Sequence, residues 1–318
     1  MEQRNIFVAG ATGATGGEVV MQLLRRGHRV RALAHRHDER AEGLARSGAE
    51  VVFGDLLDFD AMRTQLAGIQ AAYFVYPIRP GILSATVQFA QAAREAGLDM
   101  IVNMSQISAR EDSKSHAARD HWLSERVFDW SGIPTAHVRP TFFAEWLLYL
   151  APMIRAGILH VPFGTGRHAP IAAEDQAAVI AAILEQPAAH AGKIYPLFGP
   201  VELTHAEIAR AIAHELGRPV TYQQVPFETF LQILGGSGQK PPIQHTATAL
   251  YGEFEDRPDR NSGDSFLIQH LREVAVDHQN GLFAGTNNVV ETIGGRPPMT
   301  IEAFIRKHAA TFVASSAA

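Results

Sequence analysis

The fold of this chain is decided by the stretch Gly10-Ala-Thr-Gly13-Ala-Thr-Gly16-Gly17, which directly follows the apolar run Ile6–Ala9. Glycines at this spacing let a strand turn sharply, let the backbone approach a pyrophosphate and let the next helix pack closely on the strand. A helix that begins there points its unpaired N–H groups and the positive end of its dipole at an anion. We therefore expect this loop to bind a nucleotide cofactor.

Strand-like and helix-like segments alternate after the loop. A helix is predicted from Gly16 to Arg26, because apolar residues recur at helical spacing and Gly27 can cap its end. Further strands are expected at 28–34, 50–54, 71–76, 99–104 and 135–139, each separated by a helical segment. A seventh strand, 193–198, follows a helix expected at 175–186. Repeated β-α-β units predict an α/β fold with a doubly wound parallel sheet of the Rossmann type.

The second half of the chain is less regular. Thr204 and Glu207 have the spacing of a capping box at the start of an amphipathic helix. The segment 234–265 is rich in Gly, Pro, Gln and Asp and is interpreted either as a mobile lid over the substrate or as a plain linker. With 318 residues, we expect a dinucleotide-binding domain over 1–155 and a smaller C-terminal substrate lobe over 156–318, with strand 193–198 returning to the first sheet.

Composition excludes several classes of function. The net charge of −5 offers no basic field for nucleic acid or an anionic membrane. The chain has no cysteine, which excludes disulfides and thiolate chemistry and fits the reducing cytoplasm. The chain starts without an apolar signal core, and no apolar run reaches the ~18 residues of a membrane span. The most apolar stretch, 141–154, contains Glu145 and is interpreted as a helix of a soluble protein. A cytoplasmic protein with a small-molecule substrate is expected.

No metal site is predicted. The fifteen histidines are scattered, and the pairs His35/His37 and His116/His121 have neither zincin spacing nor cysteine partners. A Gly-x-Ser-x-Gly elbow is also missing, which excludes that class of hydrolase.

The end of the second strand indicates which nicotinamide cofactor is bound. Arg36 stands where NAD-specific folds place a carboxylate, and a cation would pair with a 2′-phosphate. NADP(H) is therefore preferred over NAD(H), although Asp38 and Glu39 follow closely and Arg36 could instead be a solvated basic turn. After the third strand, Asp55 could accept a hydrogen bond from the adenine amine or could cap a helix.

Taken together, the glycine loop, Gly54-Asp55, Ser105, the run 131–140 and Gly294-Gly-Arg-Pro-Pro298 resemble the NmrA-like branch of the atypical short-chain dehydrogenases/reductases over nearly the whole chain. The resemblance implies a Rossmann domain with a small substrate lobe, NADP(H) as the usual cofactor and a possible homodimer. Family members include triphenylmethane and quinone reductases as well as redox-sensing regulators, so resemblance alone does not choose between these functions. The predicted cofactor-binding residues are Gly10, Thr12, Gly13, Thr15, Gly16, Arg36, Asp55, Leu56, Tyr76, Pro77, Ser105 and His121.

The catalytic residues depart from the wider superfamily, whose Tyr-x-x-x-Lys motif is missing. Ser105 occupies the position of the usual serine, and aligning Glu125 with the glutamate that commonly follows the lysine places His121 at the lysine and Ala117 at the tyrosine. Proton delivery is then expected from His121, from Ser105 through water, or from Tyr149. With a pKa near 6.5, His121 could donate a proton or bind the nicotinamide ribose, or it could simply pair with Glu125.

A substrate pocket is expected beyond the carboxyl ends of the strands, between the two lobes. Its walls are predicted at Tyr76–Ile78, Gln106–Ile107 and 141–146, with Gln106, Phe142, Phe143 and Trp146 facing the substrate. Such aromatic walls suit an apolar carbonyl, quinone, enone, imine or dye, although the aromatic residues could also be ordinary core. The leading hypothesis is an NADPH-dependent reductase, and the alternative is an NADP(H)-sensing regulatory protein with little turnover.

Overall fold

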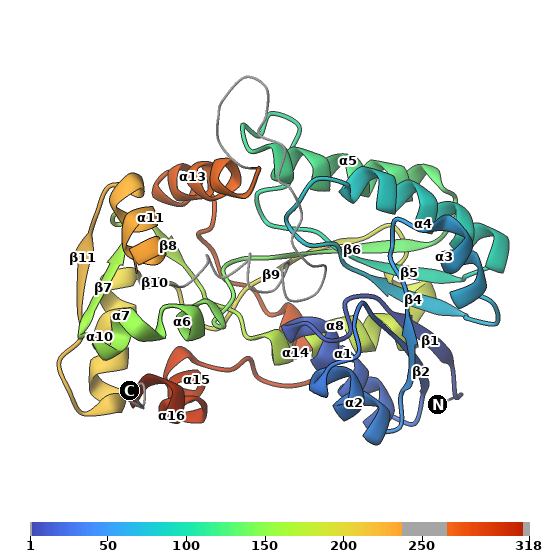
Figure 1. The fold of residues 1–318 in the computed structure, drawn as a ribbon, viewed down its shortest axis with the longest axis horizontal. Helices are drawn as coiled ribbons and strands as arrows, with labels where there is room; N and C mark the ends of the chain where they lie inside the picture. The colour runs from blue at the N-terminus through green and yellow to red at the C-terminus, as the bar shows by residue number, and fades with distance from the viewer. Residues whose placement is uncertain (1, 237–265, 314–318) are drawn as a thin grey trace.

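A seven-stranded parallel sheet forms the centre of the computed structural model, which describes residues 2–236 and 266–313 (Figure 1). The strand order is β3-β2-β1-β4-β5-β6-β9, and each pair of neighbours is parallel. This is the doubly wound Rossmann-type sheet predicted from the sequence, and the strand order reverses between β1 and β4. The strands are β1 (Asn5–Val8), β2 (Arg29–Ala34), β3 (Glu50–Phe53), β4 (Ala71–Phe74), β5 (Met100–Met104), β6 (Thr135–Pro140) and β9 (Ile194–Leu197).

Helices cover both faces of this sheet, as crossover connections between parallel strands require (Figure 1). One apolar core joins the sheet to α1 and α8, and a second core joins the opposite face to α3, α4 and α5. The first helix begins two residues earlier than expected, because Gly13 is its N-cap. The helices of these layers are α1 (Ala14–Arg25), α2 (Glu39–Arg46), α3 (Phe59–Gln65), α4 (Ile82–Ala96), α5 (His116–Trp130), α8 (Ala173–Glu185), α9 (Pro187–His190) and α14 (Val289–Thr292).

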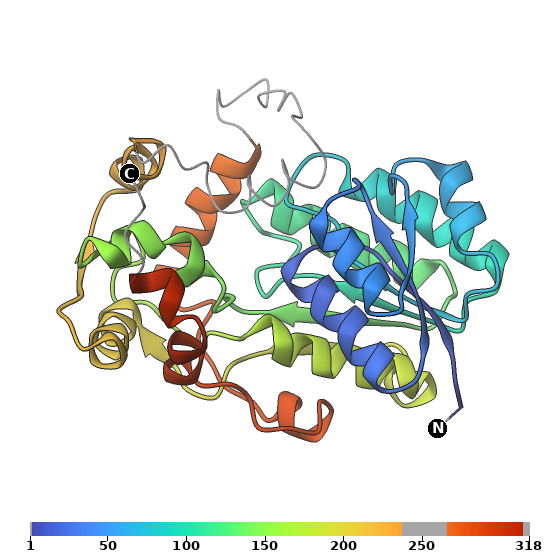
Figure 2. The ribbon, with the colours of Figure 1, turned by 60° about the horizontal axis from the view of Figure 1, so that its bottom comes forward.

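A third apolar core lies at the opposite end of the molecule from α2–α4 (Figures 1 and 2). Helices of 4 to 14 residues surround two small sheets there, in which β7 pairs with β11 and β8 with β10. The elements are α6 (Trp146–Tyr149), α7 (Ala151–Arg155), β7 (Ile158–Val161), β8 (Arg167–His168), β10 (Leu203–Thr204), α10 (His205–Leu216), β11 (Thr221–Gln224), α11 (Phe227–Gly236), α13 (Phe266–Gln279), α15 (Ile301–Lys307) and α16 (Ala309–Val313).

The chain passes between the two ends of the molecule several times. The third core already includes Phe142, whereas α8, β9 and α14 come later in the sequence and pack with the large sheet. The expected return of strand 193–198 to this sheet is thus present as β9. A domain boundary near residue 155 stays a prediction.

The apolar stretch 141–154 does not form the single helix expected from the sequence. It contains a loop, the short helix α6 and most of α7, and Pro152 stands within the first two positions of α7. A proline lacks the N–H that would continue a preceding helix, so the helix is interrupted there. In the described residues, no helix is long and apolar enough to cross a membrane.

The second half confirms the predicted capping box. Thr204 Oγ1 accepts a hydrogen bond from the Glu207 backbone, and the Glu207 side chain accepts one from the Thr204 backbone, so that α10 begins at His205. Of the predicted lid or linker, residues 237–265 lie outside the described part of the chain.

Candidate functional site

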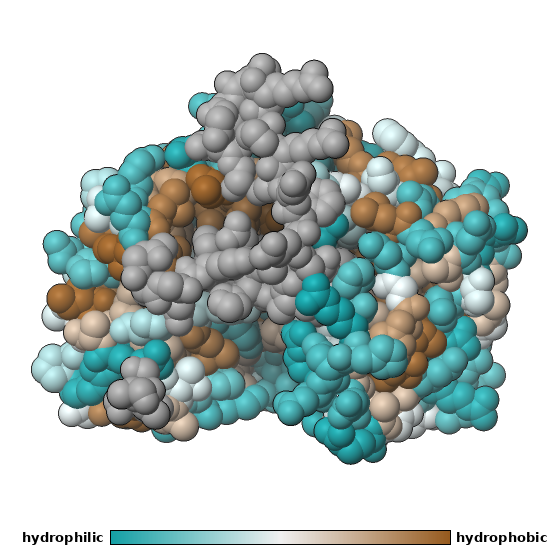
Figure 3. Space-filling model, viewed as in Figure 1, coloured by the Kyte–Doolittle hydropathy of each residue, from teal (hydrophilic) through white to brown (hydrophobic). Residues whose placement is uncertain are grey.

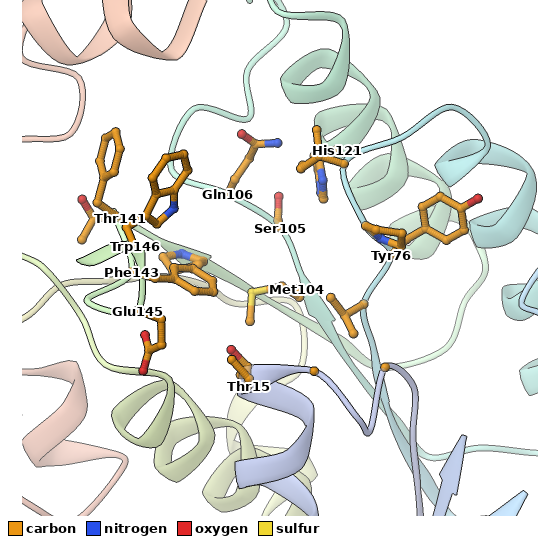
Figure 4. Close-up of a pocket in the computed structure, with 18 of the residues that line it drawn as sticks. Thr15, Tyr76, Met104, Ser105, Gln106, His121, Thr141, Phe143, Glu145 and Trp146 are labelled. Atoms are coloured by element: carbon orange, nitrogen blue, oxygen red, sulfur yellow. The ribbon is translucent and has the colours of Figure 1, made fainter. Parts of the chain in front are cut away.

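A cavity of about 290 Å³ lies beyond the carboxyl ends of β1, β4, β5 and β6 (Figure 4). Its walls come from the glycine loop, from the segments that follow these four strands, and from α5, α6 and α13. The cavity therefore lies where the strand order reverses, which is the position at which open α/β sheets bind ligands. On the face shown in Figure 3, hydrophobic residues form several separate groups, one of them at the upper left beside the centre, and hydrophilic residues dominate the right-hand edge.

The glycine loop forms one end of this cavity. Gly10 has a φ of +57°, which favours glycine, and a Cβ on Gly16 would lie only 2.1 Å from the carbonyl oxygen of Gly10. No side chain of the described residues caps the N-terminus of α1, so its first N–H groups are left for an anion. Of the predicted cofactor residues, this end of the cavity contains Gly10, Gly13, Thr15 and Gly16. A glycine-rich cradle of this shape fits a pyrophosphate.

Two arginines lie near the end of β2 and outside the cavity wall: Arg36 in the loop, and Arg40 in the first turn of α2. Arg36 is exposed there. The nearby Asp38 is the N-cap of α2, where hydrogen bonds from the Ala41 backbone and from Arg40 lower the pKa of its carboxyl. Arg40 also donates from Nη1 to the carbonyl oxygen of Thr12, at 3.3 Å. The negative charge of Asp38 is thus already paired, and sequence reasoning missed Arg40 as a second cation beside the glycine loop.

Asp55 and Leu56 do not line the cavity. Asp55 Oδ1 accepts a hydrogen bond from the backbone N–H of Leu57 at 2.9 Å, and the Leu56 side chain is buried in the core between the sheet and α3. The alternative interpretation of Asp55 as a helix cap is wrong, since the N-cap of α3 is Asp58.

Tyr76 and Pro77 follow β4 and do line the cavity. The Tyr76 hydroxyl lies 3.3 Å from the carbonyl oxygen of Pro80, to which it donates. In Figure 4 this hydroxyl points away from Ser105 and His121. Tyr76 therefore offers the cavity its ring rather than a proton.

Five buried polar atoms around the cavity have no hydrogen-bond partner among the described residues. They are Tyr73 Oη, Ser105 Oγ, Gln106 Nε2, His121 Nδ1 and Glu145 Oε2. Figure 4 shows that Ser105, Gln106 and His121 lie across the cavity from Glu145. Buried polar groups are nearly always hydrogen-bonded in native proteins, so five such atoms around one space indicate a ligand with polar groups of its own.

His121 lies on α5 and is 4% exposed. Burial, and then the neighbouring His270, lower the pKa of its imidazole to about 4. The sequence-based prediction of a proton donor assumed an ordinary pKa near 6.5, and this assumption is wrong. The ring is uncharged at neutral pH, which suits a hydrogen bond to a ligand better than proton donation.

The alternative interpretation, in which His121 simply pairs with Glu125, does not account for this histidine. Glu125 is fully buried, and its two carboxylate oxygens accept hydrogen bonds from Nε and Nη2 of Arg139, at 2.7 and 2.5 Å. Such a two-pronged bond from arginine is among the strongest between side chains. The Glu125 carboxylate is therefore committed to the packing of α5 against β6.

Aromatic side chains form the other end of the cavity. Phe142, Phe143, Trp146 and Tyr149 all line it, as does Gln106. The Phe142 ring lies 5.9 Å from that of Trp146 in an edge-to-face arrangement. Phe142 also belongs to the third core. It is therefore both a core residue, as the alternative interpretation expected, and a lining residue of the cavity.

Glu145 lines the cavity and was not predicted as a site residue. One oxygen, Oε1, accepts a hydrogen bond from the backbone N–H of Ala173 at the start of α8, at 3.0 Å. Burial raises the pKa of the Glu145 carboxyl to about 7. A signal existed in the sequence, because Glu145 is the one charged residue within the stretch 141–154.

Three further lining residues come from distant parts of the sequence. His270 and Val274 lie four residues apart on α13, and Phe283 follows that helix. His270 Nδ1 is hydrogen-bonded to Ser115 Oγ at 2.8 Å, which joins α13 to the start of α5. No local pattern in the sequence indicates that a helix so far along the chain closes this cavity.

A group of three histidines, His168, His205 and His278, lies behind the aromatic wall. Burial lowers the pKa of each imidazole, to about 4 for His278. The Phe142 ring contacts all three, with centroids 4.9 to 6.4 Å away. These histidines are 37 and 73 residues apart, so the scattered distribution in the sequence hid their proximity.

Comparison with known proteins identifies the family. The chain matches the NmrA-like family over residues 2–272. It is 31% identical over 313 residues to the NAD(P)H azoreductase of Xenophilus azovorans, with 98% of this chain and 100% of that protein covered.

Solved structures share its fold. The NADPH-dependent quinone oxidoreductase of Escherichia coli complexed with NADPH has a TM-score of 0.78 at 24% identity, and covers 96% of this chain and 99% of its own. The triphenylmethane reductase of Citrobacter sp. complexed with NADP(H) has a TM-score of 0.76 at 22% identity, with the same coverage. These structures share the fold, and the family match over residues 2–272 confirms the resemblance expected from the motifs: the chain belongs to the NmrA-like family.

Proposed function

We propose that this protein is an NADPH-dependent reductase that transfers a hydride to an apolar or aromatic carbonyl, quinone, enone, imine or dye. The observation that carries the proposal is one cavity that joins a glycine-rich loop at a helix N-terminus to an aromatic chamber (Figure 4). The 31% identical relative is named as an NAD(P)H azoreductase, which supports a reductase and adds azo compounds to the substrate classes.

Residues of this chain account for the binding of a dinucleotide. The glycine cradle and the N-terminus of α1 hold the pyrophosphate, with Thr15 beside them. The unpartnered Ser105 Oγ and His121 Nδ1 hydrogen-bond the ribose and nicotinamide groups. When bound, the reduced nicotinamide supplies the hydride.

The preference for NADP(H) is assigned to charge beside the glycine loop. Arg36 and Arg40 present two guanidinium groups to a 2′-phosphate, while the carboxylate of Asp38 is held at the helix cap. Asp55 and Leu56 remain proposed neighbours of the adenine, and Tyr76 and Pro77 of the rest of the nucleotide.

We assign the proton to Glu145. Its carboxyl has a pKa of about 7, so a large fraction is protonated at neutral pH, and Oε2 is the unpartnered oxygen at the cavity. A general acid works best with a pKa near the operating pH. Because His121 is uncharged there, Ser105 through water and Tyr149 remain the other donors.

The proposal also covers the division of the chain, the substrate-binding residues, the location and the assembly. Residues 1–155 form the dinucleotide-binding part, and 156–318 form mainly the substrate lobe, apart from α8, β9 and α14, which pack with the large sheet. Gln106, Phe142, Phe143 and Trp146 hold the acceptor. The cysteine-free composition supports a cytoplasmic location. Membership of the family supports a homodimer.

The test begins with fluorescence titrations of the purified chain with NADPH and NADH. NADPH oxidation is then followed against quinones, enones, aldehydes, imines, azo dyes and cationic dyes. We expect tighter binding of NADPH and acceptor-dependent turnover with at least one aromatic class. Tight binding without turnover on any class would overturn the reductase proposal in favour of an NADP(H) sensor.

A further inference from the structure

We propose that His168, His205 and His278 bind a divalent transition-metal ion of the zinc class behind the wall of the cavity. The three residues come from β8, from the first turn of α10 and from the last turn of α13. Each is at most 5% exposed. One ring nitrogen from each lies within 4.8 Å of the other two. The proposal does not depend on the reductase function.

The hydrogen bonds around His278 prepare it as a ligand. His278 Nδ1 lies 3.3 Å from the carbonyl oxygen of Phe163, which can only accept, so Nδ1 carries the hydrogen and Nε2 keeps its lone pair. Metal-bound histidines are oriented in this way by a carbonyl or carboxylate on the other ring nitrogen. Without a metal, His278 Nε2 accepts a hydrogen bond from His168 Nδ1 at 2.9 Å, so an ion bound between them would displace the hydrogen from His168 Nδ1. The two nitrogens thus meet at the centre of the group.

The spacing of the nitrogens is close to that of a zinc site. Zn–N bonds of ~2.0 Å at tetrahedral angles place ligand nitrogens roughly 3.3 Å apart. The pair His168–His278 must open by a few tenths of an ångström, and the third nitrogen must move inward from a separation of at most 4.8 Å. Small ring rotations of buried side chains suffice. Three histidines would leave a fourth position for water or hydroxide, and hydroxide would offset one unit of the ion's charge.

His205 supplies a second reason to expect an ion. Its Nδ1 is buried and has no hydrogen-bond partner in the described ranges 2–236 and 266–313. The ring is stacked on Phe163 with centroids 4.6 Å apart, in an otherwise aromatic environment. An unpaired buried polar group costs about 1–3 kcal/mol. Core packing alone would be served as well by phenylalanine at this position, without that cost.

An ion at this position would fix the wall of the cavity. Residues 270, 274 and 278 lie on one face of α13, because four residues are close to one helical turn. The first two line the cavity, and His278 belongs to the histidine group. Phe142 and Phe283 also contact His278 and line the cavity. The site would therefore join α13 to β8 and α10 and hold the aromatic wall in place.

The experiment uses the untagged full chain, treated with a chelator and dialysed. It is titrated with Co²⁺ and, separately, with Zn²⁺. We expect one equivalent of Co²⁺ to bind with the strong visible absorption of four-coordinate cobalt, Zn²⁺ to displace it, and either ion to raise the Tm. The absence of a stoichiometric complex in the unmodified chain would overturn the proposal whatever the variants do.

Two variants locate the ion. His205→Phe keeps an aromatic ring against Phe163 and should abolish the cobalt absorption and the metal-dependent rise in Tm while the chain stays folded. His278→Gln should do the same and serves if His205→Phe does not fold. The matched control is His214→Gln, because His214 lies on the same helix as His205 but is exposed. Unchanged cobalt binding in His205→Phe, or loss in His214→Gln, would place the ion on the surface and refute the assignment.

Discussion

The two ends of the cavity are built in different ways. The glycine end consists of consecutive residues, and its shape comes from the backbone: a left-handed Gly10 and the close approach of Gly16 to it. The aromatic end consists of side chains from Gln106 to Phe283, brought together by several elements. The glycine end is thus set by where side chains are absent, and the aromatic end by which side chains are buried together.

Burial also determines the chemistry of the second end. It raises the pKa of Glu145 to about 7 and lowers that of His121 to about 4, because a poorly solvated site disfavours the charged form of both an acid and a base. The residue types alone would give the opposite assignment, an ionised glutamate and a titrating histidine. Burial therefore makes Glu145 able to donate a proton at neutral pH and leaves His121 uncharged there.

The largest expected effect comes from Glu145→Gln. Glutamine keeps an oxygen for the Ala173 N–H but carries no transferable proton, so kcat should fall by about 10²- to 10⁴-fold, the usual contribution of a general acid. In the unmodified chain, kcat should fall as the pH rises through about 7, because the carboxyl loses its proton. The variant should lose this dependence while its Kd for NADPH stays the same. A variant with normal kcat would leave the proton to Ser105 or Tyr149.

The same variant should be more stable than the parent at alkaline pH. The folded pKa of Glu145 lies above its ordinary value of 4.5, so the folded state holds the proton more tightly than the unfolded state. The cost of ionising the buried carboxyl is absent below about pH 4.5 and fully present above about pH 7. Glu145→Gln should therefore raise the Tm at pH 8 and have little effect at pH 4.5. An equal change in Tm at both pH values would argue against burial as the cause of the pKa shift.

The glycine end of the cavity, whose shape comes from the backbone, is tested by Gly16→Ala. The added Cβ would lie 2.1 Å from the Gly10 carbonyl oxygen, so the loop must move and NADPH binding should weaken by about 100-fold, equivalent to ~3 kcal/mol. The matched control is Gly17→Ala, whose Cβ would lie 3.4 Å from the nearest atom outside its own helix. The control should bind NADPH normally in a fluorescence titration. If Gly16→Ala bound NADPH as tightly as Gly17→Ala, the cofactor would be held elsewhere.

The same contrast explains how much of the molecule could be predicted from the sequence. The turn at the glycine loop, the alternation of strands and helices along the first half of the chain and the capping box at Thr204 are local patterns, and each was confirmed because neighbours in the sequence form it. The helix expected over 141–154 failed for a local reason as well, since Pro152 was overlooked as a helix breaker.

The unpredicted part of the site depends on contacts between distant residues. Glu145 became notable only through its burial beside α8, and His270 through the return of α13 to the cavity. The histidine group arises from three elements that no spacing rule connects. Arg40 was missed because its role depends on how α2 sits against the glycine loop. Side-chain environments of this kind require the folded chain.

A smaller effect is expected at the 2′-phosphate. Arg36→Ala and Arg40→Ala should each weaken NADPH binding by about tenfold, the value of one charge-assisted hydrogen bond near the surface, and leave NADH binding unchanged. Arg46→Ala is the control, because Arg46 lies at the other end of α2 and is exposed. If Arg36→Ala and Arg40→Ala weaken the binding of NADH and of NADPH equally, the arginines stabilise the loop and do not contact the 2′-phosphate.

The smallest effect is expected from His121→Gln, and it decides whether Glu145 or His121 donates the proton. A neutral imidazole that only holds the cofactor contributes one hydrogen bond, so NADPH affinity should fall by about two- to fivefold. The fall of kcat through pH 7 should remain, because it belongs to Glu145. If the variant instead lost that pH dependence, His121 would be the proton donor and the aromatic end would work with an ordinary histidine. If both affinity and turnover were unchanged, His121 would have no part in the site, and its unpaired nitrogen would be a cost of packing α5 alone.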